Sequence, residues 1–224
     1  MQAVFYYVLN LPIKINLSYN CPLVNTTKTA EPAIRKERRF MSDKVRVAII
    51  GVGNCASSFV QGVEYYKNVA DDAQVPGLMH AKIDKYHVRD IEFTAAFDVT
   101  KSKVGKDLSE AIHAHPNNTI EFAKVPKMNV EVYRGMTHDG IGKYLKTVVE
   151  KDESDCVDIV SILKETKTDV VVSYLPVGSE MATKWYVEQI LDAGCAFVNC
   201  IPVFIAGEEY WAQRFEERNL PVIG

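Results

Sequence analysis

The sequence predicts an α/β fold in which a doubly wound parallel sheet carries helices on both faces. The run from Val45 to Ile50 is apolar except for Arg46, which is typical of a strand buried inside a parallel sheet. A glycine turn follows this run directly and opens a stretch with apolar residues at helical spacing. Apolar strands then alternate with amphipathic helices as far as the last residue, a pattern that indicates right-handed crossover connections.

The predicted elements follow one another in the order that this fold requires. The apolar face of the first helix consists of Ala56, Phe59, Val60 and Val63. A polar insertion at about 67–90 then delays the second strand, Ile91–Asp98. The later pattern predicts helices at 107–114, 140–151, 156–167, 179–194 and 208–219, and strands at 129–135, 169–176, 196–202 and 220–224. We expect Ser179 to cap the start of its helix and Gly194 to end it.

The composition is that of an ordinary globular protein. The chain has 224 residues, of which 47% are apolar and 25% charged, and a formal net charge of −3. Because it has neither a basic excess nor a cluster of basic and aromatic residues, we expect no nucleic-acid partner. The five cysteines form no C-x-x-C pair and the five histidines lack zinc spacing, so we expect no disulfide framework and no metal site made from histidines. A reduced, cytoplasmic protein fits this cysteine usage best. The cysteines are Cys21, Cys55, Cys156, Cys195 and Cys200.

Residues 1–40 differ from the rest of the chain. The opening stretch, "MQAVFYYVLNLPIKINL", is apolar but interrupted, too short for a membrane helix and without the features of a signal peptide. A polar stretch and the basic cluster "IRKERR" follow without periodicity. We interpret residues 1–40 as a disordered extension or as sequence upstream of a natural start at Met41, with an organelle-targeting leader as the alternative. The domain itself would then be 41–224.

The glycine turn matches a dinucleotide-binding pattern. Gly51, Gly53 and Ala56 stand at the spacing G-x-G-x-x-G/A, directly after a strand and at the start of a helix. The first glycine permits the tight turn, the second lets the backbone approach a diphosphate, and the alanine lets the helix pack close to the strand. The free amides and the positive dipole end of the helix then face the phosphates. The alternative is a glycine turn that serves packing alone.

Asp98 strengthens the dinucleotide interpretation because it ends the next predicted strand. A carboxylate at this position binds the adenosine ribose hydroxyls in dinucleotide-binding folds. It lies about 45 positions after the glycine turn, where about 20 is usual, because of the insertion. Val99 and Thr100 follow with no arginine to receive a 2′-phosphate, so we predict NAD over NADP. Capping of a local turn by Asp98 is the alternative.

Two further strand ends should border the same site, because ligands of such sheets lie beyond the carboxyl ends of the strands. The stretch 173–178 lies at the end of one predicted strand, and Asn199 and Pro202 lie at the end of the next. Pro176 and Pro202 taken singly are better explained as strand terminators, but two such strand ends beside the glycine turn favour a cofactor cleft. We interpret Cys55 and Cys200 as small packing residues, because neither has a histidine nearby in the sequence to act as its base.

At this point a family resemblance becomes specific. The segments "VRVAIIGVGNCASSFVQGVEYY", "VPGLMH", "YHVRDIEFTAAFDV", "GMTHDGIGKY", "VVVSYLPVGSE" and "AFVNCIPVFIA" closely resemble the N-terminal, Rossmann-type NAD-binding part of inositol-3-phosphate synthases of the shorter archaeal and actinobacterial type. The resemblance runs from about Val45 to Gly224 and leaves out residues 1–40.

The resemblance implies an isomerase that uses NAD catalytically in inositol and phospholipid biosynthesis. In that family NAD oxidises glucose 6-phosphate, the ketone allows enolisation and aldol closure, and NADH reduces the cyclic product to inositol phosphate. The family implies a cytoplasmic homotetramer without membrane or nucleic-acid partners, and a divalent or monovalent cation in the full enzyme. Carried over by position, the cofactor-binding residues would be Gly51, Val52, Gly53, Asn54, Cys55, Ala56, Asp98, Asp139, Gly140, Ser173, Tyr174, Leu175, Pro176, Gly178, Asn199 and Pro202.

The sequence departs from the family after Gly224, where members continue into a second domain that supplies the catalytic lysines and much of the tetramer interface. None of the lysines present, Lys143, Lys164, Lys167 and Lys184 among them, lies in a matching catalytic motif. We therefore assign no catalytic residue, leave the metal ligands unknown, and expect this chain to form no inositol phosphate by itself. A dinucleotide-binding module or redox sensor without chemistry, and another NAD-dependent dehydrogenase, are the alternatives.

Overall fold

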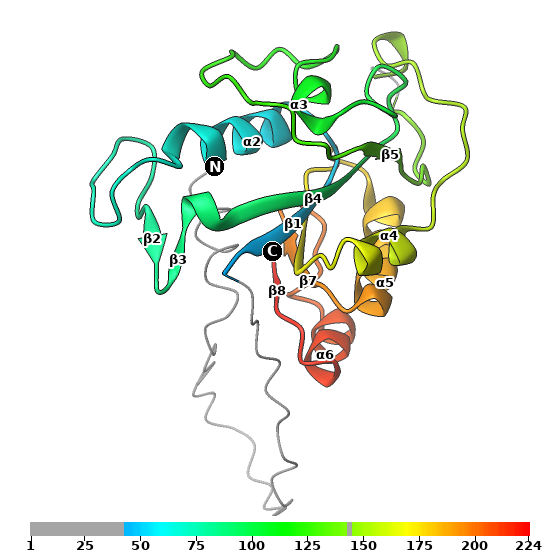
Figure 1. Cartoon of the computed structure of the whole chain (residues 1–224). Helices are drawn as coiled ribbons and strands as arrows, with labels where there is room; N and C mark the ends of the chain where they lie inside the picture. Colours follow the sequence, from blue (N-terminus) through cyan, green and yellow to red (C-terminus); the bar gives the residue numbers. More distant parts are fainter. Residues whose placement is uncertain (1–42, 143–144) are drawn as a thin grey trace, which may run out of the picture.

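The computed structural model describes residues 43–142 and 145–224, which form a six-stranded parallel sheet with helices on both faces (Figure 1). The predicted leader at 1–40, Cys21 and Lys143 lie outside the described residues. The strands are β1 (Val45–Ile50), β4 (Ile91–Asp98), β5 (Val132–Arg134), β6 (Val170–Ser173), β7 (Ala196–Asn199) and β8 (Val222–Ile223). Their order, β5-β4-β1-β6-β7-β8, is that of a doubly wound dinucleotide-binding fold, with the reversal between β1 and β6. The predicted fold class is confirmed.

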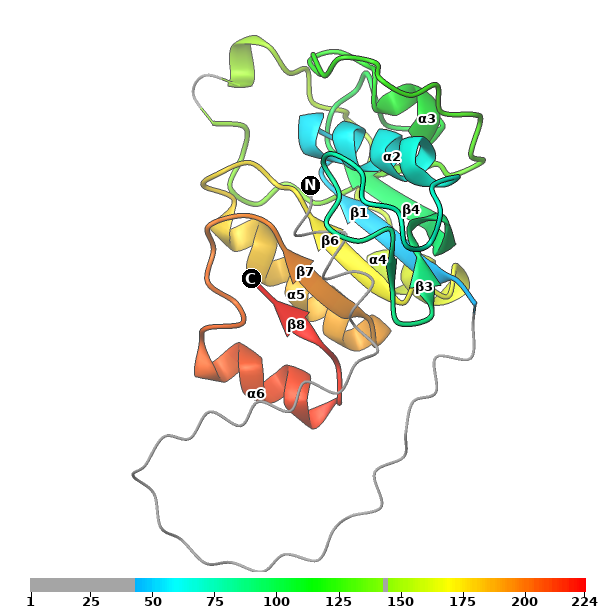
Figure 2. The same cartoon turned by 90° about the vertical axis from the view of Figure 1, so that its left-hand side faces the viewer.

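The helices divide between the two faces of the sheet, as Figure 2 shows. The helix after β1 and the one after β4 cover one face, while the three later helices cover the other. This arrangement follows from right-handed crossovers that start in opposite directions from the central strand. The helices are α2 (Asn54–Tyr66), α3 (Leu108–Ala111), α4 (Ile159–Glu165), α5 (Glu180–Ala193) and α6 (Glu209–Glu217).

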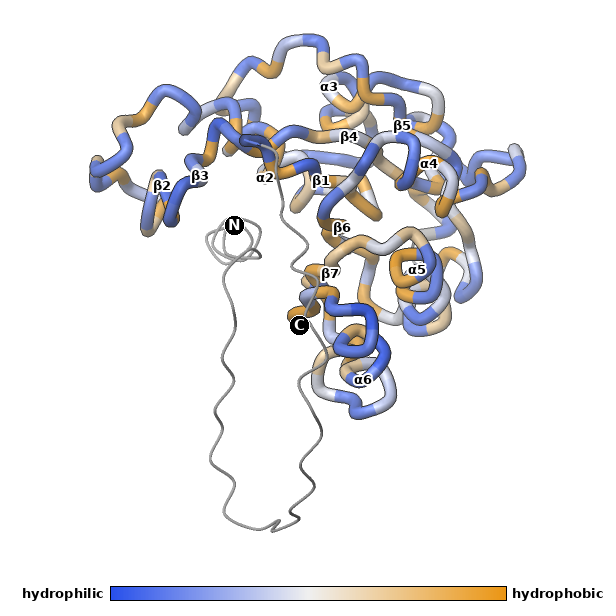
Figure 3. Tube along the Cα trace, turned by 60° about the horizontal axis from the view of Figure 1, so that its bottom comes forward, coloured by the Kyte–Doolittle hydropathy of each residue, from blue (hydrophilic) through white to orange (hydrophobic). Residues whose placement is uncertain are grey.

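The strands are buried on both faces, which explains their nearly unbroken apolar sequences. In β1, Val47 and Ile49 pack into the core beneath α2 and α3, whereas Ala48 and Ile50 pack into the core beneath α4 to α6. All four residues are at most 1% exposed. Figure 3 shows the same distribution, with hydrophobic residues in the central strands. Two cores on either side of one sheet hold the carboxyl ends of β1, β4, β6 and β7 in fixed register.

The insertion at about 67–90 folds into a small hairpin rather than an unstructured loop. It contains the antiparallel strands β2 (Lys82–Ile83) and β3 (Tyr86–His87), followed by a 3-10 turn, η1 (Val88–Asp90). His87 is 2% exposed, and its side chain accepts a hydrogen bond from the Arg89 amide. The hairpin lies at one end of the sheet, beside the start of β4 (Figure 1).

One predicted helix is wrong and two others are shorter than expected. Within the described part of 140–151 there is only a 3-10 turn, η2 (Leu145–Thr147). Gly140 adopts a φ of 72°, which a helix cannot accommodate, and glycine and β-branched residues weaken helix formation in this segment. The helix predicted at 107–114 is the single turn α3, and the one at 156–167 begins only after Asp158, whose carboxylate caps α4. Among the described residues no helix is long and apolar enough to cross a membrane.

Candidate functional site

Gly51 forms the tight turn at the carboxyl end of β1. Its φ is 87°, in the left-handed region that glycine tolerates best, and its amide donates a hydrogen bond of 2.8 Å to the Phe97 carbonyl. A Cβ at this position would lie 2.9 Å from the backbone oxygen of Tyr174, at the end of β6. Glycine is therefore required here by the fold itself, whether or not a ligand is present.

Gly53 has a different environment. It is the N-cap of α2, its φ is an ordinary −89°, and a Cβ added to it would meet no atom within 4 Å. Neither the backbone conformation nor the packing of the described chain calls for glycine at this position. A residue without a side chain is explained instead by the close approach of an external group to the backbone.

The amino end of α2 presents unpaired backbone donors. The backbone N–H groups of Gly53, Asn54 and Cys55 donate no hydrogen bond to any of the described residues. Asn54 and Cys55 are exposed, whereas Ala56 is fully buried against the sheet. Three free N–H groups at the start of a 13-residue helix form an anion-binding arrangement.

Asp98 holds the glycine turn from the neighbouring strand. One carboxylate oxygen accepts a 2.7 Å hydrogen bond from the Val52 amide, and the other accepts 2.8 Å bonds from the Val99 and Thr100 amides. The residue is 8% exposed. Because a carboxylate has roughly four acceptor positions, these three bonds leave one on the oxygen beside the turn. Asp98 thus does cap a local turn, as the alternative interpretation suggested, and it also contacts the predicted phosphate-binding turn.

Two residues that the sequence did not indicate hold the next peptide of the turn, which joins Val52 to Gly53. The Lys103 ammonium donates hydrogen bonds of 2.7 Å to the Val52 carbonyl and 2.9 Å to the Asn117 side-chain oxygen, and lies 4.0 Å from Asp98. Burial lowers the pKa of Lys103, while the Asp98 carboxylate opposes this shift. The Asn117 amide group donates a second bond, of 3.0 Å, to the Val52 carbonyl. Lys103 lies 51 residues from Val52 in the chain, so no local motif could have shown the contact.

The side chain of Asn54 faces a neighbouring segment. Its amide group donates to Asn118 at 2.8 Å, and its oxygen accepts from the Asn118 amide and the Thr119 hydroxyl, each at 2.9 Å. Asn54 can therefore offer a ligand its backbone amide, because its side chain is already used to anchor the segment after α3.

The end of β6 lies directly beside the glycine turn. Ser173 pairs with Ile50, and the Tyr174 amide donates a 2.8 Å hydrogen bond to the Ile50 carbonyl. The Tyr174 ring packs edge-on against Phe59 of α2, with ring centroids 6.4 Å apart, and burial raises the pKa of its hydroxyl. Leu175 is partly buried and Pro176 is exposed. The structure thus brings Ser173, Tyr174 and Leu175 together with the turn.

The end of β7 lies one strand further along. Asn199 pairs with Ser173, and the Cys200 amide donates a hydrogen bond of 3.2 Å to the Ser173 carbonyl. The Ser173 hydroxyl and the Asn199 side-chain oxygen are buried polar atoms without a hydrogen-bond partner among the described residues. Pro202 is exposed on the loop that follows. This edge of the sheet therefore keeps polar atoms that the described part of the fold does not satisfy.

The interpretation of Cys55 and Cys200 as packing residues is wrong, because both are exposed. Although Cys200 is exposed as a whole, desolvation of its thiol and the proximity of Cys55 raise the pKa of that thiol to about 11. Of the four cysteines that the structure describes, Cys195 is the fully buried one, and its Sγ donates a hydrogen bond of 3.2 Å to the Thr168 carbonyl. Both exposed cysteines lie close enough to Tyr174 to raise the pKa of its hydroxyl further, at the same edge of the sheet as the glycine turn.

Asp139 has a structural function. Its carboxylate accepts hydrogen bonds from the Met181 and Ala182 amides, at 3.0 and 2.7 Å, and so caps α5 in place of Ser179, which makes no side-chain cap bond. The amino end of α5 therefore carries its own anion, unlike that of α2. Gly140 and Gly178 are exposed with positive φ values of 72° and 95°. No contact within the described part of the chain brings Asp139, Gly140 or Gly178 to the glycine turn.

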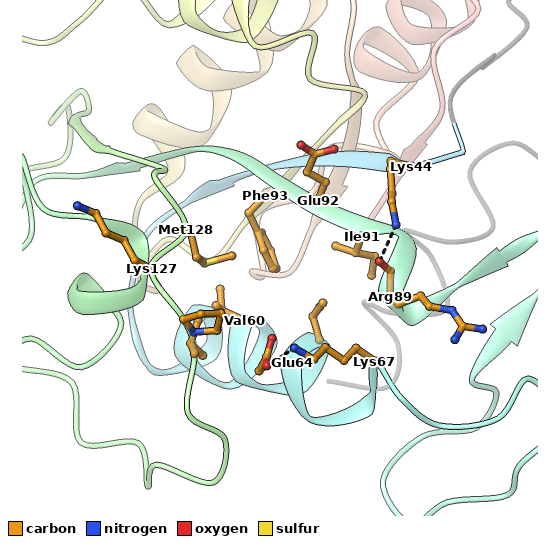
Figure 4. Close-up of a pocket in the computed structure, with 13 residues that line it drawn as sticks. Lys44, Val60, Glu64, Lys67, Arg89, Ile91, Glu92, Phe93, Lys127 and Met128 are labelled. Carbon is orange, nitrogen blue, oxygen red and sulfur yellow. Dashed lines mark hydrogen bonds and ion pairs between the residues drawn. The ribbon is translucent and has the colours of Figure 1, made fainter.

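A separate groove of about 400 Å³ lies between α2, the start of β4 and the segment 125–128 (Figure 4). Its floor includes Val60, Phe93 and Met128, and charged side chains surround it. Ile91, at the amino end of β4, also lines it, so the groove lies at the edge of the sheet opposite the glycine turn. It is therefore not part of the predicted dinucleotide site. In residues 43–142 and 145–224, no group of three or more His, Cys, Asp or Glu side chains could hold a metal ion.

Comparison with known proteins tests the resemblance. No family model matches the sequence. The inositol-3-phosphate synthase of Mycolicibacterium smegmatis is 58% identical over 181 residues, which cover 81% of this chain and 50% of that protein. The enzyme of the same name from Corynebacterium glutamicum is 52% identical over 180 residues, covering 80% of this chain and 50% of that protein. The resemblance to inositol-3-phosphate synthases is confirmed.

Solved structures agree with this result. The crystal structure of Ari2 is 33% identical, has a TM-score of 0.68, and matches 81% of this chain and 52% of its own. A myo-inositol-1-phosphate synthase-related protein from Thermotoga maritima is 26% identical, has a TM-score of 0.60, and matches 81% of this chain and 54% of its own. The chain spans about half the length of the inositol-3-phosphate synthases that it matches.

Proposed function

We propose that this chain is the NAD-binding half of an inositol-3-phosphate synthase, which converts glucose 6-phosphate to inositol phosphate. The observation that carries the proposal is the combination of Gly53, which the described chain itself does not require, with three unpaired amides at the amino end of α2. The identity of 52–58% with inositol-3-phosphate synthases supports this reaction over other NAD-dependent chemistry.

In this proposal the amides of Gly53, Asn54 and Cys55 bind the diphosphate of NAD. Each charge-assisted hydrogen bond from such an amide contributes about 1.5–3 kcal/mol. The free acceptor position on Asp98 receives a ribose hydroxyl, and the nicotinamide end lies toward β6 and β7. When bound, the nicotinamide supplies a reversible hydride acceptor.

The ends of β6 and β7 supply the other part of the proposed cofactor site. The Tyr174 backbone crosses Gly51 and separates the glycine turn from Asn199. Tyr174 therefore serves as a wall that orients the cofactor. Asp139, Gly140, Pro176, Gly178 and Pro202 remain part of the proposed site, on the loops at the same edge of the sheet.

For the complete enzyme we propose further features that do not depend on the residues of this half alone. These are a homotetramer, a cation near the cofactor phosphates, a cytoplasmic location, and lysines from the second half that bind the substrate phosphate and move protons. In a chimera that joins residues 43–224 to the remaining half of the Mycolicibacterium smegmatis relative, we expect NAD-dependent formation of inositol phosphate. A folded chimera that binds NAD but leaves glucose 6-phosphate unchanged would contradict the proposed reaction and favour a binding module.

Calorimetric titration of the 224-residue chain with NADH and with ADP-ribose tests the cofactor itself. ADP-ribose carries the diphosphate and the adenosine ribose but no nicotinamide, so both ligands should bind and NADH should bind more tightly. Failure of both to bind a chain shown to be folded by circular dichroism would refute the proposal.

A further inference from the structure

The peptide that joins Val52 to Gly53 is fixed from inside the protein. The Val52 carbonyl accepts hydrogen bonds from the Lys103 ammonium, at 2.7 Å, and from the Asn117 amide group, at 3.0 Å. Lys103 is 2% exposed, and Asn117 is partly buried. The contacts of Lys103 with Val52, Asn117 and Asp98 offset the cost of burying its charge.

The direction of this carbonyl decides where the next amide points. A trans peptide is planar, and its C=O and N–H groups point to opposite sides. Because Lys103 and Asn117 draw the Val52 carbonyl inward, the Gly53 N–H points outward, toward the space in which a Cβ meets no atom. Rotation of this one peptide would turn the N–H inward and present a carbonyl oxygen to the ligand.

Glycine makes such a rotation a real alternative. Rotating a peptide changes ψ of the residue before it and φ of the residue after it, and glycine populates positive and negative φ about equally. No atom lies within 4 Å of the Cβ position of Gly53, so packing alone does not hold its φ at −89°. Gly53, the residue that lets a diphosphate approach, is thus also one at which the Val52–Gly53 peptide could rotate. The orientation of this peptide therefore has to be fixed by other groups.

We propose that Lys103 and Asn117 are positioning residues for the diphosphate site, which prevent rotation of the Val52–Gly53 peptide and keep the Gly53 amide directed at the ligand. This inference rests on the proposed dinucleotide function. It assigns to Lys103 a specific effect on the phosphates, which it does not touch, in addition to its contribution to folding. Asp98 fixes the preceding peptide through the Val52 amide, so the two peptides of the turn are held separately.

The test compares ligands with and without a diphosphate. ADP-ribose and adenosine are titrated into the wild-type chain and into the variants Lys103→Met and Asn117→Asp, at a temperature where each is folded. Lys103→Met removes the ammonium donor at similar length, and Asn117→Asp removes the amide donor with the same shape. Lys106→Met is the matched control, since Lys106 is exposed and lies three residues along the same segment.

We expect both variants to lose at least tenfold in affinity for ADP-ribose and less than twofold for adenosine, and the control to change neither. The amide resonance of Gly53 should also shift in both variants without ligand. Should Lys103→Met fail to fold, Asn117→Asp decides the question, because it leaves the Lys103 bond to Val52 in place. Equal losses for the two ligands, or ADP-ribose affinity within twofold of wild type in a folded variant, would overturn the inference. A wild-type chain that binds neither NADH nor ADP-ribose would instead overturn the proposed function.

Discussion

Alanine substitutions at the two glycines of the turn should damage two different properties of the molecule. At Gly51 the new Cβ would lie 2.9 Å from the Tyr174 oxygen and 3.0 Å from its carbonyl carbon, in a backbone with a φ of 87°. The left-handed backbone costs an alanine about 1–2 kcal/mol. The contact with another backbone, which cannot rotate away, adds about 1–3 kcal/mol. We therefore expect Gly51→Ala to lower the free energy of unfolding by about 2–5 kcal/mol.

At Gly53 the same substitution should leave the fold intact and lower the affinity for NADH. The added methyl group meets no atom of the protein and the φ is already negative, so we expect less than about 1 kcal/mol of destabilisation at this N-cap position. The methyl would project into the space through which a diphosphate approaches. Loss of one charge-assisted hydrogen bond corresponds to an NADH affinity about 10- to 100-fold lower.

Urea denaturation and calorimetric titration with NADH measure the two effects separately. Gly207→Ala is the matched control for Gly53→Ala, since Gly207 also has open space at its Cβ position and no positive φ. In the control, the free energy of unfolding should change by no more than about 0.5 kcal/mol, as is usual for a surface substitution, and the NADH affinity should not change. The reasoning is refuted if Gly53→Ala binds NADH as tightly as wild type, or if Gly51→Ala unfolds at the wild-type urea concentration.

Because a 2′-phosphate would add negative charge beside Asp98, NADH should bind at least about tenfold more tightly than NADPH in calorimetric titration, and the reverse order would be inconsistent with the proposed site. Burial alone would raise the pKa of Asp107, but hydrogen bonds from the Ser109 hydroxyl and from the Met128 and Ser109 amides lower it. Asp107→Ala should therefore cost about 1–3 kcal/mol at pH 7, an effect that shrinks in urea denaturation as the pH falls below about 4, and a pH-independent cost would contradict this assignment. The raised pKa of about 11 at Cys200 predicts an alkylation rate, followed by mass spectrometry, that still increases between pH 9 and 11, against a plateau near pH 9 for an ordinary thiol.

The parts of the fold that could be predicted are those with a local cause. A run such as Val45–Ile50 reads as a buried strand because both of its faces must be apolar, and the glycine turn after it has a fixed spacing. The helix wrongly predicted at 140–151 was also inferred from a local pattern. Apolar residues recur there at helical spacing, but the positive φ of Gly140 and the bond of Asp139 to α5 direct the chain along the surface. That bond joins residues 42 positions apart or more, and the sequence gives no sign of it.

The candidate site, too, could be predicted only where its residues form a local sequence pattern. Gly51, Gly53 and Asp98 stand in a recognisable pattern, and the structure places all three around one turn. Lys103 and Asn117 belong to no motif, because their importance arises only when the segments after β4 and α3 fold back beneath the turn. Burial of a lysine cannot be read from its sequence neighbours, since lysine is ordinarily a surface residue.

The proposed function depends above all on the amides at the start of α2, which should bind the diphosphate of a dinucleotide. Titration of NADH into the ¹⁵N-labelled chain, followed by amide chemical shifts, tests it most directly. We expect the largest shifts at Gly53, Asn54 and Cys55, with smaller shifts at Ser173 and Tyr174. Shifts confined to the groove around Phe93, at the opposite edge of the sheet, would contradict it.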